Sequence, residues 1–102
     1  MGLYIITKGV LGNLFIGKLE VKEKAKTYKV IKGCMYFHKK KINKNEIDVF
    51  YDDVVLSFNK DKGIEIFKKG LIEKKNILEE EYKSKKNKIE ILLENIDEIS
   101  NR

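Results

Sequence analysis

The spacing of apolar residues changes once along this chain of 102 residues, near Asp61. Before that point the spacing is the period of two that side chains have in strands: Phe15, Leu19 and Val21 share one face. After it, apolar residues recur at spacings of three and four, the period of an amphipathic helix. Strands followed by a helix are typical of the α+β class. The sequence therefore predicts an α+β protein whose sheet precedes its helix.

Residues 1–58 are interpreted as an antiparallel β-domain. Six short strands are expected, at residues 3–9, 14–21, 27–32, 34–38, 47–51 and 54–58. Between the first two strands, the sequence VLGN supplies glycine and asparagine where a tight turn needs positive φ. The chain has no proline, so its turns depend on glycine, asparagine and aspartate. Short strands at this spacing predict a β-meander or a small, partly open barrel.

Residues 59–102 are expected to form one long C-terminal amphipathic helix, with Asn59 or Asp61 capping its start. Read as heptads, the helix places apolar residues at positions a and d, interrupted by Lys68, Lys75 and Lys85. The predicted oligomerisation residues of this seam are Leu71, Leu78, Tyr82, Ile89, Leu92, Ile96 and Ile99.

A single helix from Asp61 to Ile99 would be about 58 Å long, longer than a sheet domain of this size covers. Two arrangements remain. The helix pairs with another chain as a coiled coil, or the polar run at residues 83–88 is a corner that folds the helix back over the sheet. We favour pairing, and hence a homo-oligomer, because the seam would otherwise leave a large apolar patch on a monomer.

The net charge is +6, and lysine supplies nearly all of the positive charge. The surplus lies in residues 1–56, whereas residues 57–102 are nearly balanced. An anionic partner would explain this surplus, and so would an AT-rich coding sequence, which inflates lysine, isoleucine and asparagine whatever the function. No run approaches the roughly 18 apolar residues of a membrane span. The polar face of the helix is mixed in sign and not basic, so no membrane partner is expected. A single cysteine fits a reducing cytoplasm.

Cys34 and His38 are the only cysteine and histidine. A zinc site needs about four ligands of such types. On the expected strand the pair would be about 13 Å apart, too far for an imidazole to activate a thiolate. No P-loop, dinucleotide or nucleophile-elbow motif occurs, and the adjacent Asp52 and Asp53 predict a turn. We therefore expect no enzyme, no catalytic residue, no metal and no cofactor.

Residues 36–44 combine aromatic, lysine and asparagine side chains. Aromatic rings stack on bases, and lysine and asparagine bind phosphates and base edges. The predicted ligand-binding residues are Tyr36, Phe37, His38, Lys39, Lys40, Lys41, Asn43 and Lys44. The same residues also fit an alternative in which the aromatics belong to the core and the lysines to a solvated turn.

The stretches IITKGVLGNLFIGKLEVKEKAKTYKV and VVLSFNKDKGIEIFKKGLIEKKNILEEEY resemble small lysine-rich accessory proteins encoded by phages and prophages of low-GC Gram-positive bacteria. The resemblance implies a phage accessory protein in the cytoplasm of a bacterial host. Small phage proteins of this size include counter-defence factors. Some are oligomeric sponges that sequester nucleotide immune signals, and others are anti-CRISPR proteins that occlude an effector. No site residue is carried over from the resemblance.

These observations together predict a non-enzymatic counter-defence sponge. It would form a homo-oligomer through its C-terminal helix and sequester a small anionic nucleotide. The first alternative is an inhibitor that binds nucleic acid or a host protein through the basic β-face, in the manner of an anti-CRISPR protein. The second alternative is a small structural phage protein.

Overall fold

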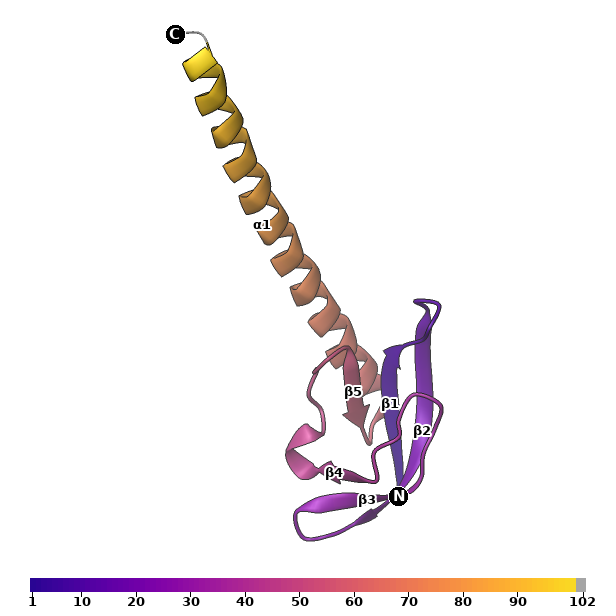
Figure 1. The fold of residues 1–102 in the computed structure, drawn as a ribbon. Helices are drawn as coiled ribbons and strands as arrows, with labels where there is room; N and C mark the ends of the chain where they lie inside the picture. Colours follow the sequence, from indigo (N-terminus) through magenta and orange to yellow (C-terminus); the bar gives the residue numbers. More distant parts are fainter. Residues whose placement is uncertain (101–102) are drawn as a thin grey trace. The chain divides into compact units, whose positions relative to one another are not determined.

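The computed structural model describes residues 1–100; residues 101–102, which the predicted helical domain includes, lie outside the described part. The fold is α+β, as predicted: a five-stranded antiparallel half-barrel sheet is followed by one long C-terminal helix (Figure 1). The elements are β1 (Gly2–Lys8), β2 (Leu14–Glu23), β3 (Thr27–Lys32), β4 (Lys41–Asn43), the 3₁₀ helix η1 (Lys44–Glu46), β5 (Val54–Ser57) and α1 (Lys60–Ser100).

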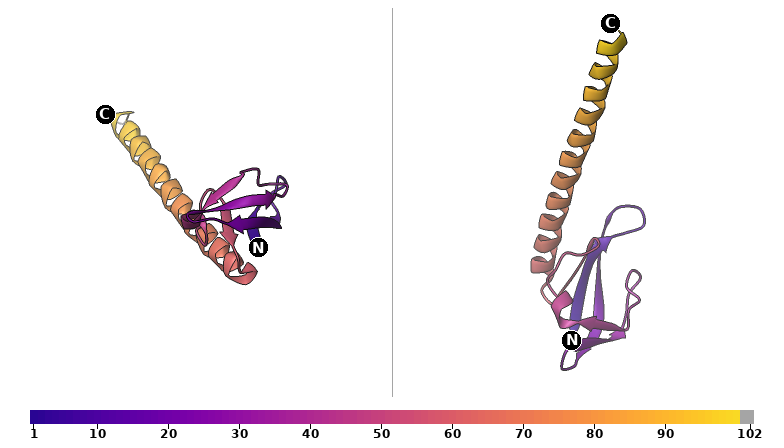
Figure 2. Two further views of the ribbon diagram at one scale, coloured as in Figure 1. Left: turned by 90° about the horizontal axis from the view of Figure 1, so that it is seen from below. Right: turned by 60° about the vertical axis from the view of Figure 1, so that its left-hand side comes forward.

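The strand order is β4-β3-β2-β1-β5, so β1 to β4 form a meander and β5 returns to the other edge of β1. In the centre of the sheet, Ile6 lies opposite Ile16 of β2 and Val55 of β5. The register of β2 and β3 shifts between Glu20 and Val21. Irregularities of this kind increase the local twist of a sheet, and the sheet is visibly curved in Figure 2.

The predicted strand at residues 34–38 is wrong. This segment is a tight turn in which the Phe37 amide donates a hydrogen bond to the Cys34 carbonyl at 3.2 Å. The pairing strand is β4, in the stretch interpreted as a turn. Phe37 still packs against the core. The apolar pattern therefore identified the buried side chain correctly, but burial alone does not give a segment a strand partner.

The predicted strand at residues 47–51 is also wrong. Only isolated bridges occur there, at Ile47 and Tyr51, and η1 precedes the segment. Asp48 interrupts any extended run with a φ of 58°, in the left-handed region that aspartate tolerates better than most residues. Its side chain and backbone contacts, described below, hold this conformation.

The sheet is buried on both faces only at β1 and β5, since β2, β3 and β4 expose Lys22, Lys29 and Lys41 on one face. One face carries the larger core cluster: Leu3, Ile5, Leu19, Val21, Ile42 and Leu56. On the opposite face Ile6 and Val55 pack with Phe67 of α1. The adjacent residues Ile5 and Ile6 of β1 thus pack into clusters on opposite faces of the sheet, because successive side chains of a strand point to opposite faces.

The start of α1 fits closely against the sheet. Asn59 caps the helix, because its Oδ1 accepts a hydrogen bond from the Lys62 amide at 3.0 Å. A Cβ at Gly63 would lie 2.5 Å from Cδ1 of Ile6, and a Cβ at Gly70 would lie 2.3 Å from Cγ of Phe50. Glycine at these two positions therefore permits the close approach.

The chain divides into two compact units, residues 1–71 and the part from Ile72 onward. The first turns of α1 thus belong to the unit of the sheet, whereas the sequence interpretation placed the boundary at residue 58. The helix is uninterrupted from Lys60 to Ser100, so residues 83–88 are not a corner. Within residues 1–100, no helix combines the length and the apolar character needed to cross a membrane.

Candidate ligand-binding pocket

A pocket of about 810 Å³ lies where three segments of the first unit meet. Its volume falls within the range of about 300–1,000 Å³ that is typical of small-molecule sites. The segments are the end of the turn before β4, the stretch from β4 into η1, and the loop that leads into β5. The lining residues are Tyr36, Phe37, His38, Lys39, Asn43, Asn45, Glu46, Val49, Tyr51, Asp52, Val54 and Leu56.

The two aromatic residues of the turn fix its position. The Tyr36 hydroxyl accepts a hydrogen bond from the Val10 amide at 3.2 Å. Its ring packs edge to face on Phe15, with 4.6 Å between the ring centroids. Phe37 packs against the larger core cluster. Both rings therefore anchor the turn, and the exposed His38 and Lys39 are the basic side chains that this turn offers to a ligand.

The structure brings together most of the predicted ligand-binding residues. Tyr36, Phe37, His38, Lys39 and Asn43 line the pocket. Lys40 lines a neighbouring pocket of about 320 Å³, which shares Phe37, His38 and Lys39 with the first.

Lys41 and Lys44 line neither of these two pockets. The Nζ of Lys44 lies 2.9 Å from Oε2 of Glu23 and 5.4 Å from the centroid of the Tyr28 ring. It therefore ties η1 to the hairpin of β2 and β3. Lys41 is an exposed residue of β4 opposite Lys29 of β3.

Sequence reasoning missed the other side of the pocket, including Glu46, Tyr51 and Asp52. Asp52 and Asp53 have φ values of 51° and 61°. Tyr51 and Val54 exchange both backbone hydrogen bonds around them, at 3.1 and 3.0 Å, as in a two-residue type I′ hairpin. The turn at Asp52 and Asp53 was predicted. Tyr51 directly precedes this turn and is 80% exposed, and an aromatic residue beside a predicted turn could have indicated a binding site.

Cys34 and His38 do not lie on a strand, so the separation expected between them is wrong. The expected separation of about 13 Å assumed a strand, and residues 34–38 form a turn instead. Both residues line the smaller pocket. Within residues 1–100 no hydrogen bond joins their side chains, and no group of three or more His, Cys, Asp or Glu residues has a metal-binding arrangement. The absence of catalysis remains a prediction.

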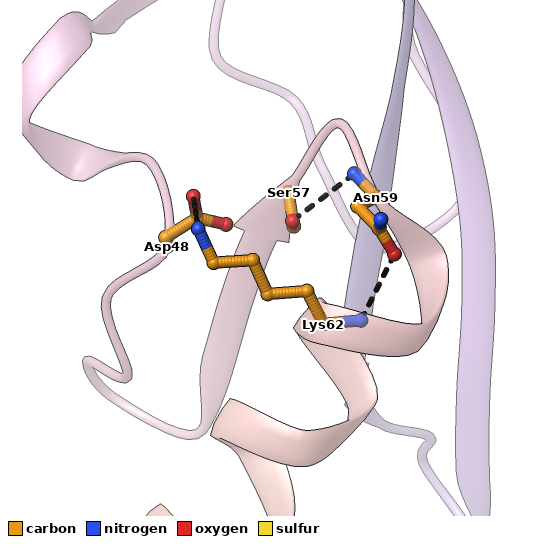
Figure 3. A network of polar contacts seen from close by, with 4 residues as sticks. All are labelled: Asp48, Ser57, Asn59 and Lys62. Carbon is orange, nitrogen blue, oxygen red and sulfur yellow. Dashed lines mark hydrogen bonds and ion pairs between the residues drawn. The ribbon is translucent and has the colours of Figure 1, made fainter.

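Asp48 holds in place the loop that carries Glu46, Tyr51 and Asp52 (Figure 3). Its Oδ2 lies 3.0 Å from Nζ of Lys62 on α1, and its amide donates to the Leu56 carbonyl at 2.8 Å. Oδ1 is buried without a hydrogen-bond partner among the described residues. Desolvation raises the pKa of Asp48, but the Ser57 hydroxyl and the Lys62 ammonium outweigh it and hold the pKa below its ordinary value.

We expect Asp48→Asn to lower the free energy of unfolding at pH 7 by about 1 kcal/mol, since the ion pair is partly exposed. Asparagine also tolerates positive φ. Because folding lowers the pKa of Asp48, its stabilising effect is fully present above the unfolded pKa, about 3.9. The effect is lost as the pH falls through the folded pKa. Urea titrations of both proteins between pH 2 and pH 7 measure this difference, with the exposed Asp97→Asn as control. A constant difference across this range would contradict the assignment.

The chemistry of the pocket lining is mixed. His38 and Lys39 are basic, Glu46 and Asp52 are acidic, and Asn43 and Asn45 offer amides. A lining of this kind suits a ligand that has an anionic group at one end and hydrogen-bond donors elsewhere. No protein-family model matches the chain, and no curated protein and no solved structure matches it either. Inference about function therefore rests on the chemistry of the pocket.

Proposed function

We propose that this protein is a non-enzymatic binding protein that sequesters a small anionic nucleotide. The observation that carries the proposal is that His38, Lys39, Asn43 and Glu46 line one pocket. Charge-assisted hydrogen bonds from Lys39 suit a phosphate. Carboxylate and amide oxygens suit the amino groups of a base.

Tyr51 is the aromatic ring of the pocket best suited to stack on a base, because it is 80% exposed. Tyr36 has one partner in Phe15 and a second in the Val10 amide. In this proposal Tyr36 positions the turn and Tyr51 covers the base. The bound nucleotide is held and not converted, which is the property of a sponge, and the role in phage counter-defence implied by the resemblance is part of the proposal.

Isothermal titration calorimetry with a panel of cyclic nucleotides tests this proposal. We expect micromolar or tighter binding to at least one member, with the nucleotide recovered chemically unchanged. Lys39→Glu should weaken that binding by at least about tenfold, or about 1.4 kcal/mol, because it places a carboxylate beside the phosphate. Lys22→Glu makes the same charge change on β2, outside the pocket, and should bind normally. No heat with any member at protein concentrations well above micromolar would refute the proposal.

A second candidate, binding of nucleic acid by the basic β-face, is favoured by one observation. Lys22 lies opposite Lys29, and Lys29 lies opposite Lys41, so three exposed lysines form a row across β2, β3 and β4. Directly opposed like charges destabilise a sheet, and a phosphate backbone would relieve that repulsion. This candidate predicts affinity for DNA or RNA that falls steeply with salt. Lys29→Glu should weaken binding to DNA or RNA, and Lys39→Glu should weaken it less.

A further inference from the structure

We propose that residues 72–95 pair with the same residues of a second copy as an antiparallel two-stranded coiled coil. The register sets Leu78 opposite Ile89 of the second copy. This inference rests on the homo-oligomer of the predicted sponge and adds its orientation and register. It concerns the second unit alone.

The helix presents an apolar stripe that nothing in the described residues covers. Its exposed fractions are 68% for Tyr82, 58% for Ile89, 61% for Leu92 and 58% for Ile96. Tyr82, Ile89 and Ile96 occupy a positions of the heptad pattern and Leu92 a d position, with Lys85 at the d position between Tyr82 and Ile89. Leu93 and Ile72 extend the stripe at positions e, at 56% and 49% exposed. A stripe of this width is typical of a helix that packs on a partner.

The two lysines of the seam distinguish the possible orientations. A parallel, in-register pair would set Lys75 against Lys75 and Lys85 against Lys85 in the centre of the interface. The antiparallel register instead sets Lys85 opposite Tyr82 and Lys75 opposite Leu92. An ammonium beside a tyrosine ring is favourable, and a lysine stem covers apolar surface while its charge stays in water. The antiparallel pair therefore removes two repulsive layers.

A groove on the helix supports the same orientation. It has a volume of about 480 Å³ and is lined by Tyr82, Lys85, Lys86, Ile89 and Glu90. The first four of these residues have the spacing i, i+3, i+4, i+7, which forms the four-residue hole of coiled-coil packing. In a parallel pair the side chain entering this hole would be a third lysine, Lys85 of the second copy. In the antiparallel register it is Tyr82 of the second copy, an aromatic ring between two cations.

The flanking positions are complementary in the antiparallel register. Glu79 comes opposite Lys86 of the second copy, and Glu81 comes opposite Lys88. A parallel pair would also form flanking ion pairs, through Glu81 and Lys86, so these charges alone do not decide the orientation.

The flanking apolar residues do decide between the orientations. The antiparallel register sets Ile72 opposite Leu93 of the second copy, whereas a parallel pair sets Leu93 beside Lys88. The flanking apolar residues thus meet each other only when the chains run in opposite directions, and the seam lysines then face apolar residues and not each other.

Disulfide trapping in the full chain tests the orientation. In a Cys34→Ala background, which removes the only native cysteine, the variants Leu92→Cys and Lys75→Cys are made separately. An oxidised equimolar mixture should give the mixed disulfide dimer. Leu92→Cys alone should give none, because the two Leu92 positions of an antiparallel pair lie about 25 Å apart, against the roughly 6 Å between Cα atoms of a disulfide.

Two results would overturn the antiparallel register: efficient cross-linking of Leu92→Cys alone, or a dimeric protein whose oxidised mixture contains no mixed disulfide. Either result would leave the proposed homo-oligomer unaffected. Sedimentation of the unsubstituted chain as a monomer at about 100 μM would overturn both the pairing and the oligomeric part of the proposed function. Nucleotide titration reports on the pocket separately, so the two failures are distinguishable.

Discussion

Replacing Ile42 with alanine is expected to lower the free energy of unfolding by about 2–5 kcal/mol, the range for truncation of a fully buried isoleucine. Ile42 is 0% exposed and belongs to the larger core cluster. It is also the only apolar residue of β4, a strand of three residues. Loss of its packing should therefore loosen β4, which carries Asn43 of the pocket, so nucleotide affinity should fall together with stability.

Ile31→Ala on the neighbouring strand β3 is the matched control. Ile31 is 57% exposed, so its truncation should change stability by no more than about 0.5 kcal/mol. Urea unfolding followed by near-ultraviolet circular dichroism at one fixed protein concentration measures both variants, because stability of an oligomer depends on concentration. Equal effects of the two substitutions would show that β4 does not close the core.

Replacing Ile89 with glutamate is expected to weaken self-association by at least about 100-fold, equivalent to about 2.7 kcal/mol. In the proposed coiled coil Ile89 faces Leu78 of the second copy, and the symmetry of a dimer introduces two such sites. Each would place a carboxylate in an apolar layer of the interface, which is unfavourable. Sedimentation equilibrium over a range of protein concentrations measures the dissociation constant.

Ile91→Glu is the control for this substitution. Ile91 is 56% exposed, close to the 58% of Ile89, and the two substitutions change charge and helix propensity identically. Ile91 occupies heptad position c, outside the seam, so its replacement should leave association nearly unchanged. If both variants dissociate equally, general charge and not the seam governs association. If neither dissociates, the seam residues do not form the interface.

The two wrongly predicted strands share one physical cause. Residues 34–38 and 47–51 are rich in apolar and aromatic residues, and Phe37 and Ile47 do pack against the core. Apolar content indicates that some side chains are buried, but a strand also needs a neighbouring backbone in register. Only isolated bridges occur in these segments, so tertiary packing made them loops. Residues of both loops line the pocket.

The candidate site was predictable only in part for a related reason. Tyr36 to Lys39 and Asn43 are close in sequence, so a local run of suitable residue types identified them. Lys44 belonged to the same run, but Glu23, 21 residues earlier, pairs with it. Tyr51 and Asp52 line the opposite wall because β5 returns beside β1, and no local pattern contains that pairing.

The sequence by itself determined the features that depend on neighbouring residues. The strand and helix periods gave the α+β class, Asn59 capped the helix, and Gly12 took the positive φ of its turn. Only the tertiary structure decided which loops meet and which charges are paired. Local conformation follows from the side chains of a few adjacent residues, whereas a pocket requires segments far apart in the chain to be brought together by a shared core.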